Sequence, residues 1–162
     1  MSTPTEHALA LNAELHDQLD FHWQHQLRPR LDGLTDRERL WEPVPGVPTS
    51  AWRLAHITDD CLAQRTASHF GGPPSGGAAS VAGADEALAR LDEAYDAWSA
   101  GVRGLGEGGL ARPCGEAEGP FASYPLASLV LHINRETIHH GAEIALLRDL
   151  YAHRPTTSEE TR

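Results

Sequence analysis

The stretch HINRETIHHGAEIALLRDLY, residues 132–151, contains the pattern that decides the fold. It is predicted to belong to one uninterrupted helix that begins near Pro125 and ends at about Tyr151. Steps of four and three residues define one face of such a helix, which has 3.6 residues per turn. The outer members of this face are typical of a helix-bundle core, and the three central ones are polar. The face carries Leu129, Ile133, Glu136, His140, Glu143, Leu147 and Leu150.

Glu136 and His140 are therefore predicted to point inward. A buried carboxylate costs several kcal/mol unless it is paired or bound to a metal. Residues four apart on a helix have Cβ atoms about 5–6 Å apart, so both side chains can bind one ion. A hydrogen-bonded Glu–His pair without metal is the alternative. His139 is rotated by about 100° and is expected beside the site, whereas His132 lies ~12 Å along the helix from His140.

The opening segment, residues 6–34, is predicted to be a long amphipathic helix. Its apolar residues recur mostly every fourth position, and Pro29 is expected to kink it before Gly33 ends it. Thr35 and Glu38 then have the spacing of a capping box, which predicts a short helical turn. The recurring apolar residues are Leu11, Leu15, Leu19, Trp23, Leu27, Leu31 and Leu34.

Two more helices are predicted at residues 50–70 and 85–105. Ser50 is the expected N-cap of the first. Residues 71–84 are rich in glycine and are predicted to be a flexible loop, and residues 106–124 show no periodicity and are predicted to be a long loop. Four long helices without a strand signal predict an all-α four-helix bundle with long inter-helix loops. The apolar stripe of the third predicted helix, residues 85–105, is Leu88, Leu91, Tyr95, Trp98 and Val102.

The chain of 162 residues is long enough to bury a core as a single domain. That domain is expected at residues 6–152, between a flexible N-terminus at residues 1–5 and a flexible polar tail at residues 153–162. No apolar run approaches the roughly 20 residues that span a bilayer, and no signal peptide opens the chain. We therefore expect a cytoplasmic protein without a membrane partner.

The composition excludes several kinds of chemistry. A formal net charge of −10 argues against nucleic acid or an anionic membrane as a partner, because both require clustered basic residues. All 13 basic residues are arginine, so Schiff-base lysine chemistry is absent. Cys61 and Cys114 form neither a CxxC motif nor a disulfide framework, and Cys61 is expected to be a small buried residue.

A third metal ligand must come from another helix, and His56 is the candidate. It lies at the edge of the apolar face marked by Leu54, Thr58 and Leu62. A lone histidine there is usually structural. His56 becomes a candidate metal ligand only because Glu136 and His140 already form a pair. Asp60 or Asp59 is expected to hold its other ring nitrogen. A ferritin-like di-iron site is unsupported because there is no second Glu-x-x-His, and the HExxH motif of zinc proteases is absent.

Three segments together resemble a known family. WEPVPG, residues 41–46, precedes AHI at residues 55–57, and ExxxHHGAEIALLRDLY begins at Glu136; QLDFHWQHQLRPRLDGLTDRERLWEPVPG covers residues 18–46. These segments resemble the DinB-like superfamily, and most closely its branch of mycothiol-dependent maleylpyruvate isomerases. The resemblance covers about residues 9–152. It implies a metal-binding four-helix bundle, usually a homodimer, in which one divalent metal is held by His56, Glu136 and His140.

The sequence departs from the family at one point. Family members often have Gly-Gln after the histidine pair, whereas this chain has Gly141, Ala142 and Glu143. An acidic residue at this position alters the charge around the site. Asp60, Arg135, His139 and Glu143 are the candidates for residues that contact the ligands or the substrate. Arg148 is either a contact for an anionic substrate group or an exposed helix arginine.

Three protein ligands with an open fourth position are typical of a catalytic zinc site. Zinc is the first expectation, and histidine with carboxylate also suits nickel, manganese or iron. Such a metal acidifies a bound water or thiol. By the resemblance, the working hypothesis is an enzyme that activates a low-molecular-weight, mycothiol-like thiol for S-transfer, addition to an electrophilic substrate, or isomerisation. The alternatives are a metal-dependent hydrolase, a non-catalytic metal-binding or stress-response protein, and a metal-independent binding module.

Overall fold

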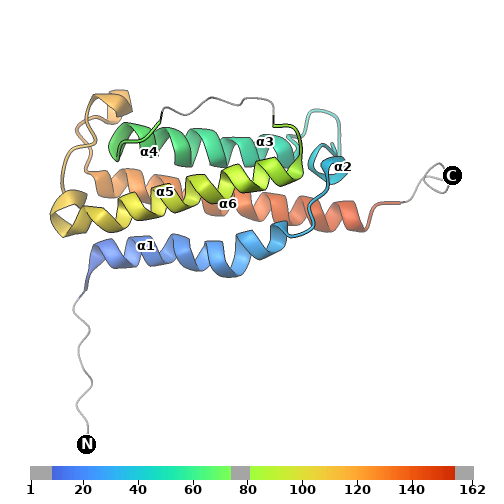
Figure 1. Cartoon of the computed structure of the whole chain (residues 1–162), viewed down its shortest axis with the longest axis horizontal. Coiled ribbons are helices and arrows are strands. Elements are labelled where there is room, and N and C mark those ends of the chain that lie inside the picture. The colour runs from blue at the N-terminus through green and yellow to red at the C-terminus, as the bar shows by residue number, and fades with distance from the viewer. Residues whose placement is uncertain (1–8, 74–80, 156–162) are drawn as a thin grey trace, which may run out of the picture.

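A computed structural model describes residues 9–73 and 81–155 of the chain. These residues are helical and contain no β-strand, and their long helices lie side by side along one axis (Figure 1). The all-α prediction is confirmed. The predicted flexible N-terminus at residues 1–5 lies outside the described residues, as do residues 74–80 of the predicted flexible loop and residues 156–162 of the predicted tail.

The first helical stretch changes its winding along its length. It consists of α1 (Leu11–His22), the π-helical η1 (Trp23–Leu27) and the 3₁₀-helical η2 (Arg28–Leu31). Pro29 lies in η2, and Gly33 follows at φ 72°, the left-handed conformation that ends helices. The predicted stripe is buried from Leu15 to Leu34. Leu11 is an exception: it is exposed because it is the first residue of the helix.

A short turn and a second composite stretch follow. α2 (Asp36–Arg39) is capped as predicted, since the Thr35 hydroxyl accepts from the Glu38 N–H at 3.2 Å. α3 (Ser50–Ala55), the π-helical η3 (His56–Ala63) and α4 (Gln64–His69) then continue from one to the next. The N-cap prediction was wrong by one residue. Thr49 Oγ1 accepts from the Trp52 N–H at 3.2 Å, which leaves Ser50 as the first helical residue.

The remaining elements are α5 (Ala84–Leu110), the 3₁₀-helical η4 (Glu116–Phe121) and α6 (Leu126–Ala152). The predicted loop at residues 106–124 is wrong in part, because α5 continues past a break at Gly106 and η4 lies within the loop. Backbone hydrogen bonds close this connection, from Cys114 N–H to the Tyr124 carbonyl at 2.7 Å and from Leu126 N–H to the Arg112 carbonyl at 2.8 Å. The segment before α6 is therefore held in an ordered conformation by its own backbone hydrogen bonds.

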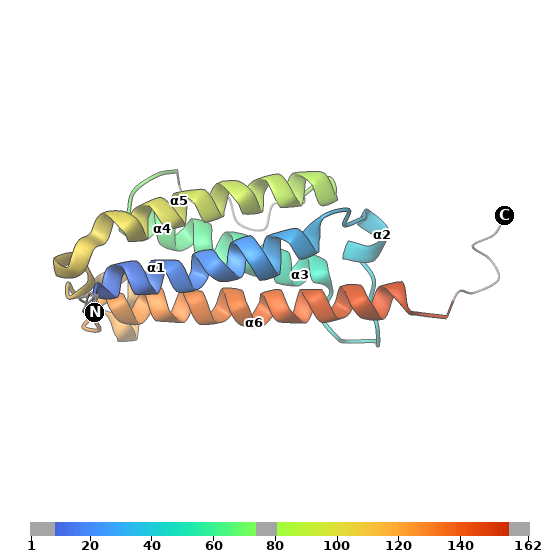
Figure 2. The same ribbon diagram turned by 90° about the horizontal axis from the view of Figure 1, so that it is seen from below.

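The helices pack in two opposed pairs. α5 and α6 each contact α1 and also η3, so α1 lies on one side of them and the α3–η3–α4 stretch on the other (Figures 1 and 2). Trp23 of η1 stacks on Tyr95 of α5, with ring centroids 3.9 Å apart. Trp98, Ile57 and Leu62 are fully buried between the pairs. Counted separately, the described residues hold six α-helices, so this count by itself does not confirm the predicted four-helix bundle.

The buried stripe of α6 is rotated from the predicted one. It passes through Asn134, Thr137, Gly141 and Ile144, along with the expected Leu129, Ile133 and Leu147. Glu136, His140 and Glu143 lie on the flank of this stripe and are half-buried, and Leu150 is exposed. Glu136 and His140, which were predicted to point inward, are half-buried and face the α3–η3–α4 stretch rather than the centre of the core.

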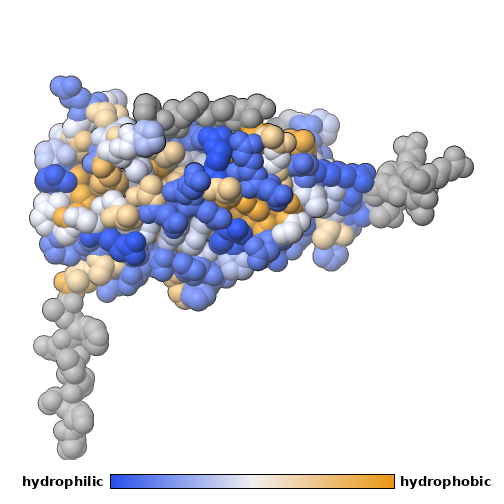
Figure 3. Space-filling view, in the orientation of Figure 1, coloured by the Kyte–Doolittle hydropathy of each residue, from blue (hydrophilic) through white to orange (hydrophobic). Residues whose placement is uncertain are grey.

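None of the described helices is both long enough and apolar enough to cross a membrane. Polar and charged side chains cover much of the face drawn in Figure 1, with smaller apolar areas between them (Figure 3). This surface agrees with the amphipathic pattern of the individual helices.

Candidate metal centre

Two helical stretches bring three donor side chains together. His56 is the first residue of η3, and Glu136 and His140 lie one turn apart on α6. The Oε2 atom of Glu136 lies 3.8 Å from His56 Nε2 and 3.6 Å from His140 Nε2. One donor atom from each residue lies within 4.8 Å of the other two. The three residues that the sequence singled out as ligands thus meet in one place.

The spacing of these atoms fits a divalent metal ion. Tetrahedral zinc with bonds of about 2.1 Å places its donors roughly 3.4 Å apart. The two separations from Glu136, 3.6 and 3.8 Å, need only a small closure to reach this value, and the two histidine donors lie within 4.8 Å of each other. The donor set is two imidazole nitrogens and one carboxylate oxygen, a combination that borderline divalent metals accept.

A carboxylate binds each histidine ring at Nδ1, the nitrogen on the far side from the converging Nε2 atoms. Asp60 Oδ2 lies 3.0 Å from His56 Nδ1, and Glu143 Oε2 lies 2.8 Å from His140 Nδ1. An acceptor at Nδ1 favours the tautomer with its proton there and a free lone pair on Nε2. Both rings are therefore oriented with Nε2 toward the centre. Asp60 and Glu143 lie where contacts to the ligands were expected.

Arg53 is part of the site, and the sequence interpretation missed it. This buried side chain of α3 donates from Nε to Glu143 Oε2 at 2.7 Å and from its guanidinium to the Pro48 carbonyl. Burial raises the pKa of Glu143, but hydrogen bonds from Arg53 and His140 outweigh it and hold that pKa below its ordinary value. The available signal was the three-residue spacing from Arg53 to His56, which places both on one helix face.

Trp52 covers the two histidine rings on the outer side. Its ring is stacked on His56 with centroids 5.4 Å apart and meets the edge of His140 at 5.9 Å. The side chain is itself half exposed. His56 and Glu136 each keep 25% of their side-chain surface exposed, so the site is open to solvent beside this aromatic ring.

Cys61 lies closer to the site than expected. Its predicted burial is confirmed, and its Sγ atom lies 3.6 Å from His56 Nε2. Burial raises the pKa of this thiol to about 12, and the Glu136 and Asp60 carboxylates add to the shift. Without a metal the Cys61 thiol stays protonated at neutral pH, so it is a poor nucleophile by itself.

His139 and Arg135 lie outside the trio. His139 is exposed, and its Nε2 atom is 3.6 Å from Glu143 Oε1, so it shares Glu143 with His140 in a second cluster of potential donors. Arg135 Nε lies 3.7 Å from Glu136 Oε1, and its NH2 group donates to His132 Nδ1 at 2.7 Å. Both residues border the site without pointing at the converging donor atoms.

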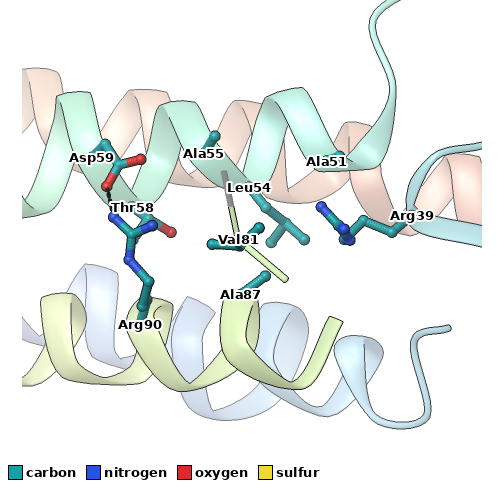
Figure 4. Close-up of a pocket in the computed structure, with 9 residues that line it drawn as sticks. All are labelled: Arg39, Ala51, Leu54, Ala55, Thr58, Asp59, Val81, Ala87 and Arg90. Atoms are coloured by element: carbon teal, nitrogen blue, oxygen red, sulfur yellow. Dashed lines mark hydrogen bonds and ion pairs between the residues drawn. The ribbon is translucent and has the colours of Figure 1, made fainter. Parts of the chain in front are cut away.

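Asp59 and Arg148 have other roles. Asp59 faces α5, where Arg90 donates to it at 2.6 Å beside a cavity of about 40 Å³ (Figure 4). That volume holds about one water molecule. Arg148 makes a two-pronged contact with Glu38 at 2.7 and 3.2 Å and donates to the Asp32 carbonyl. The suggestion of a substrate contact for Arg148 was wrong, because the guanidinium ties α6 to α2.

The fold and the site define an all-helical protein with a His–Glu–His donor cluster. A sequence profile of the DinB superfamily matches residues 18–144, which is most of the chain. The chain therefore belongs to the DinB superfamily, whose members often bind metal. No curated protein and no solved structure matches it. The mycothiol-dependent isomerase branch stays a prediction.

Proposed function

We propose that the protein is a metal-dependent enzyme in which His56, Glu136 and His140 hold one divalent ion. Zinc is the first candidate for this ion, and the fold around it is a bundle of four helical stretches. The convergence of three donor atoms, with a carboxylate behind each histidine, is the observation that carries this proposal. A site that served stability alone would need no opening to solvent, whereas His56 and Glu136 here each keep 25% of their side-chain surface exposed.

The open side of the site supports binding of a small molecule. Three protein donors leave a fourth position, and a divalent metal there supplies acidification of a bound thiol or water. The protein's own thiol near the centre, Cys61, is buried and stays protonated without a metal, with its Sγ atom 3.6 Å from His56 Nε2. We therefore propose that the thiol comes from solution as a low-molecular-weight, mycothiol-like cosubstrate, which is transferred to, or added to, a small electrophile.

The surrounding residues prepare the site for that chemistry. Asp60 and Glu143 hold the two imidazoles in one orientation, and Arg53 holds Glu143 in turn. Arg53, Asp60 and Glu143 thereby fix the donors before any ligand arrives, which lowers the cost of binding. Trp52 covers the outer side of the rings and limits access by bulk water.

A conjugation assay tests this function. Zinc-loaded protein is incubated with mycothiol, bacillithiol or glutathione and a panel of small electrophiles, and adducts are measured by mass spectrometry. We expect metal-dependent adducts that His140→Ala abolishes and His139→Ala, at the exposed neighbour, retains. Absence of adducts with every thiol contradicts the proposal, and metal-dependent ester hydrolysis without thiol consumption replaces it with a hydrolase. The homodimer and the cytoplasmic location stay predictions.

A further inference from the structure

A second cavity lies beside the donor trio. It has a volume of about 430 Å³ and is enclosed by α4, the connection that contains η4, and the first half of α6. Phe121, Tyr124 and Leu129 supply apolar walls, and Arg65, Arg135 and His132 supply basic groups. The volume lies within the range of small-molecule sites, which are about 300–1,000 Å³.

Glu136 contacts residues of both this cavity and the metal centre. Its Oε2 atom faces His56 and His140, at 3.8 and 3.6 Å. Its Oε1 atom faces the cavity residues, 3.8 Å from His132 Nδ1 and 3.7 Å from Arg135 Nε. One oxygen of this carboxylate thus contacts the metal centre, and the other contacts residues that line the cavity. A molecule in the cavity lies next to whatever the trio binds.

The cavity presents an accessible basic group to an anion. Its carboxylate, Glu118, is buried and already engaged by Arg65 at 3.0 Å and by His69 at 2.8 Å. Arg135 donates to the imidazole of His132 at 2.7 Å, and 69% of its side-chain surface is exposed. Its guanidinium can therefore turn toward a ligand at low cost. Arg65 is committed to Glu118. The carboxylate of Glu136 lies 3.7 Å from Arg135 Nε, so the exposed end of the Arg135 guanidinium is the basic group that an anion can reach.

We propose that this cavity binds a small carboxylate with an aromatic or apolar body, held by Arg135 through its charged group and by Phe121 and Tyr124 through its body. The proposal rests on the proposed function in one respect: this carboxylate is the substrate that reacts at the neighbouring metal centre. Arginine matches a carboxylate in geometry as well as in charge, because its N–H groups pair with both oxygens. The exposed rings of Phe121 and Tyr124 provide the apolar contact.

A fluorine NMR titration tests the charge selection. The probes are 4-fluorophenylacetate and its neutral counterpart 4-fluorophenylacetamide, and the full chain is first depleted of metal so that no ion binds the carboxylate. We expect the carboxylate to bind about fivefold more tightly than the amide, as one charge-assisted contact at a partly exposed arginine predicts. Arg135→Gln removes this preference, and Arg103→Gln, on an exposed position of α5 away from the cavity, retains it.

Ser128→Trp fills the cavity and should weaken the binding of both probes. Equal affinity for the two probes, or an unchanged preference in Arg135→Gln, overturns the proposal.

A paramagnetic measurement tests the position of the cavity relative to the trio. Mn²⁺-loaded protein should relax the fluorine nucleus of the bound carboxylate faster than Zn²⁺-loaded protein. In His140→Ala, the relaxation rates in the presence of Mn²⁺ and Zn²⁺ should be equal. Equal relaxation with both ions overturns the proximity. Metal content, measured on the same samples, separates the two claims. Arg135-dependent binding in a protein that takes up no metal supports the cavity and contradicts the proposed function. Metal uptake without a preference for the carboxylate probe supports the proposed function and contradicts the carboxylate site in the cavity.

Discussion

Glu143 Oε2 lies 2.8 Å from Nδ1 of His140, three residues before it on α6. The same oxygen accepts from Arg53 Nε at 2.7 Å, so one carboxylate atom joins the two helical stretches that carry the donor trio. The His140 ring cannot rotate without breaking this contact. The site is therefore held in shape by the protein itself.

Replacing Glu143 by glutamine should weaken metal binding. The amide keeps the size of the side chain but removes the charge that holds His140 and Arg53, and loss of such an outer partner costs about 10–100-fold in metal affinity. We expect a loss of roughly tenfold for Glu143→Gln, measured by competition with a chromophoric zinc chelator. Glu93→Gln, at an exposed position of α5, is the control. An unchanged zinc affinity would show that His140 needs no support from Glu143.

Asp60→Asn should have a smaller effect of the same kind. Asp60 holds His56 at 3.0 Å, but 65% of its side-chain surface is exposed, so water can replace it as acceptor for the Nδ1 proton. We expect zinc affinity to fall by about threefold, less than for Glu143→Gln. The same chelator competition measures it, and an effect larger than that of Glu143→Gln contradicts this ranking.

The contribution of Glu143 to stability should depend on pH. Its pKa is lowered in the folded protein from the ordinary value of 4.5, so the ionised form favours folding. That contribution is complete above pH 4.5 and is lost as the pH falls through the lower folded value. We expect Glu143→Gln to be less stable than the wild-type protein at pH 5.5, with a smaller difference at pH 3. Urea denaturation in EDTA measures both, and a difference that grows toward low pH is the contrary result.

Two glycines of α5 should respond in opposite ways to alanine. A Cβ atom at Gly101 would lie 2.1 Å from the Phe70 ring, whereas one at Gly104 would meet nothing within 4 Å. Overpacking of this kind costs about 1–3 kcal/mol. Alanine at an open helix position gains about 0.5–1 kcal/mol from helix propensity. Thermal unfolding of Gly101→Ala and Gly104→Ala should therefore shift in opposite directions, and two shifts of the same sign would contradict this packing of α5 on Phe70.

Helix positions were predictable from the sequence because apolar periodicity and end signals act locally. Thr35 caps α2 as its spacing with Glu38 predicts. The extension of α5 past Gly106 was not predictable, because it depends on tertiary packing that ends in the buried Leu110. The π-helical winding of η3, which begins at His56, also has no signal in the apolar pattern.

The three members of the donor trio were predictable from the sequence, whereas the residues that surround and orient them were less so. The four-residue spacing of Glu136 and His140 fixes their proximity on one helix. The helix pattern offered His56 as a candidate and the resemblance agreed, but only the packing of η3 on α6 shows that it meets them. The contact from Arg53 to Glu143 spans 90 residues, so no local pattern reveals it. The small rotation of the buried stripe of α6 likewise depends on which helices it packs against.

The metal content of the purified protein tests the central claim most directly. Elemental analysis should find about one divalent ion per chain in the wild-type protein and in His139→Ala, the exposed neighbour of the site. His56→Ala and His140→Ala should each lose most of that ion, while their helical content by circular dichroism stays unchanged. A wild-type protein that takes up no divalent metal, or a folded His140→Ala variant that keeps the full amount, would contradict a metal centre at His56, Glu136 and His140.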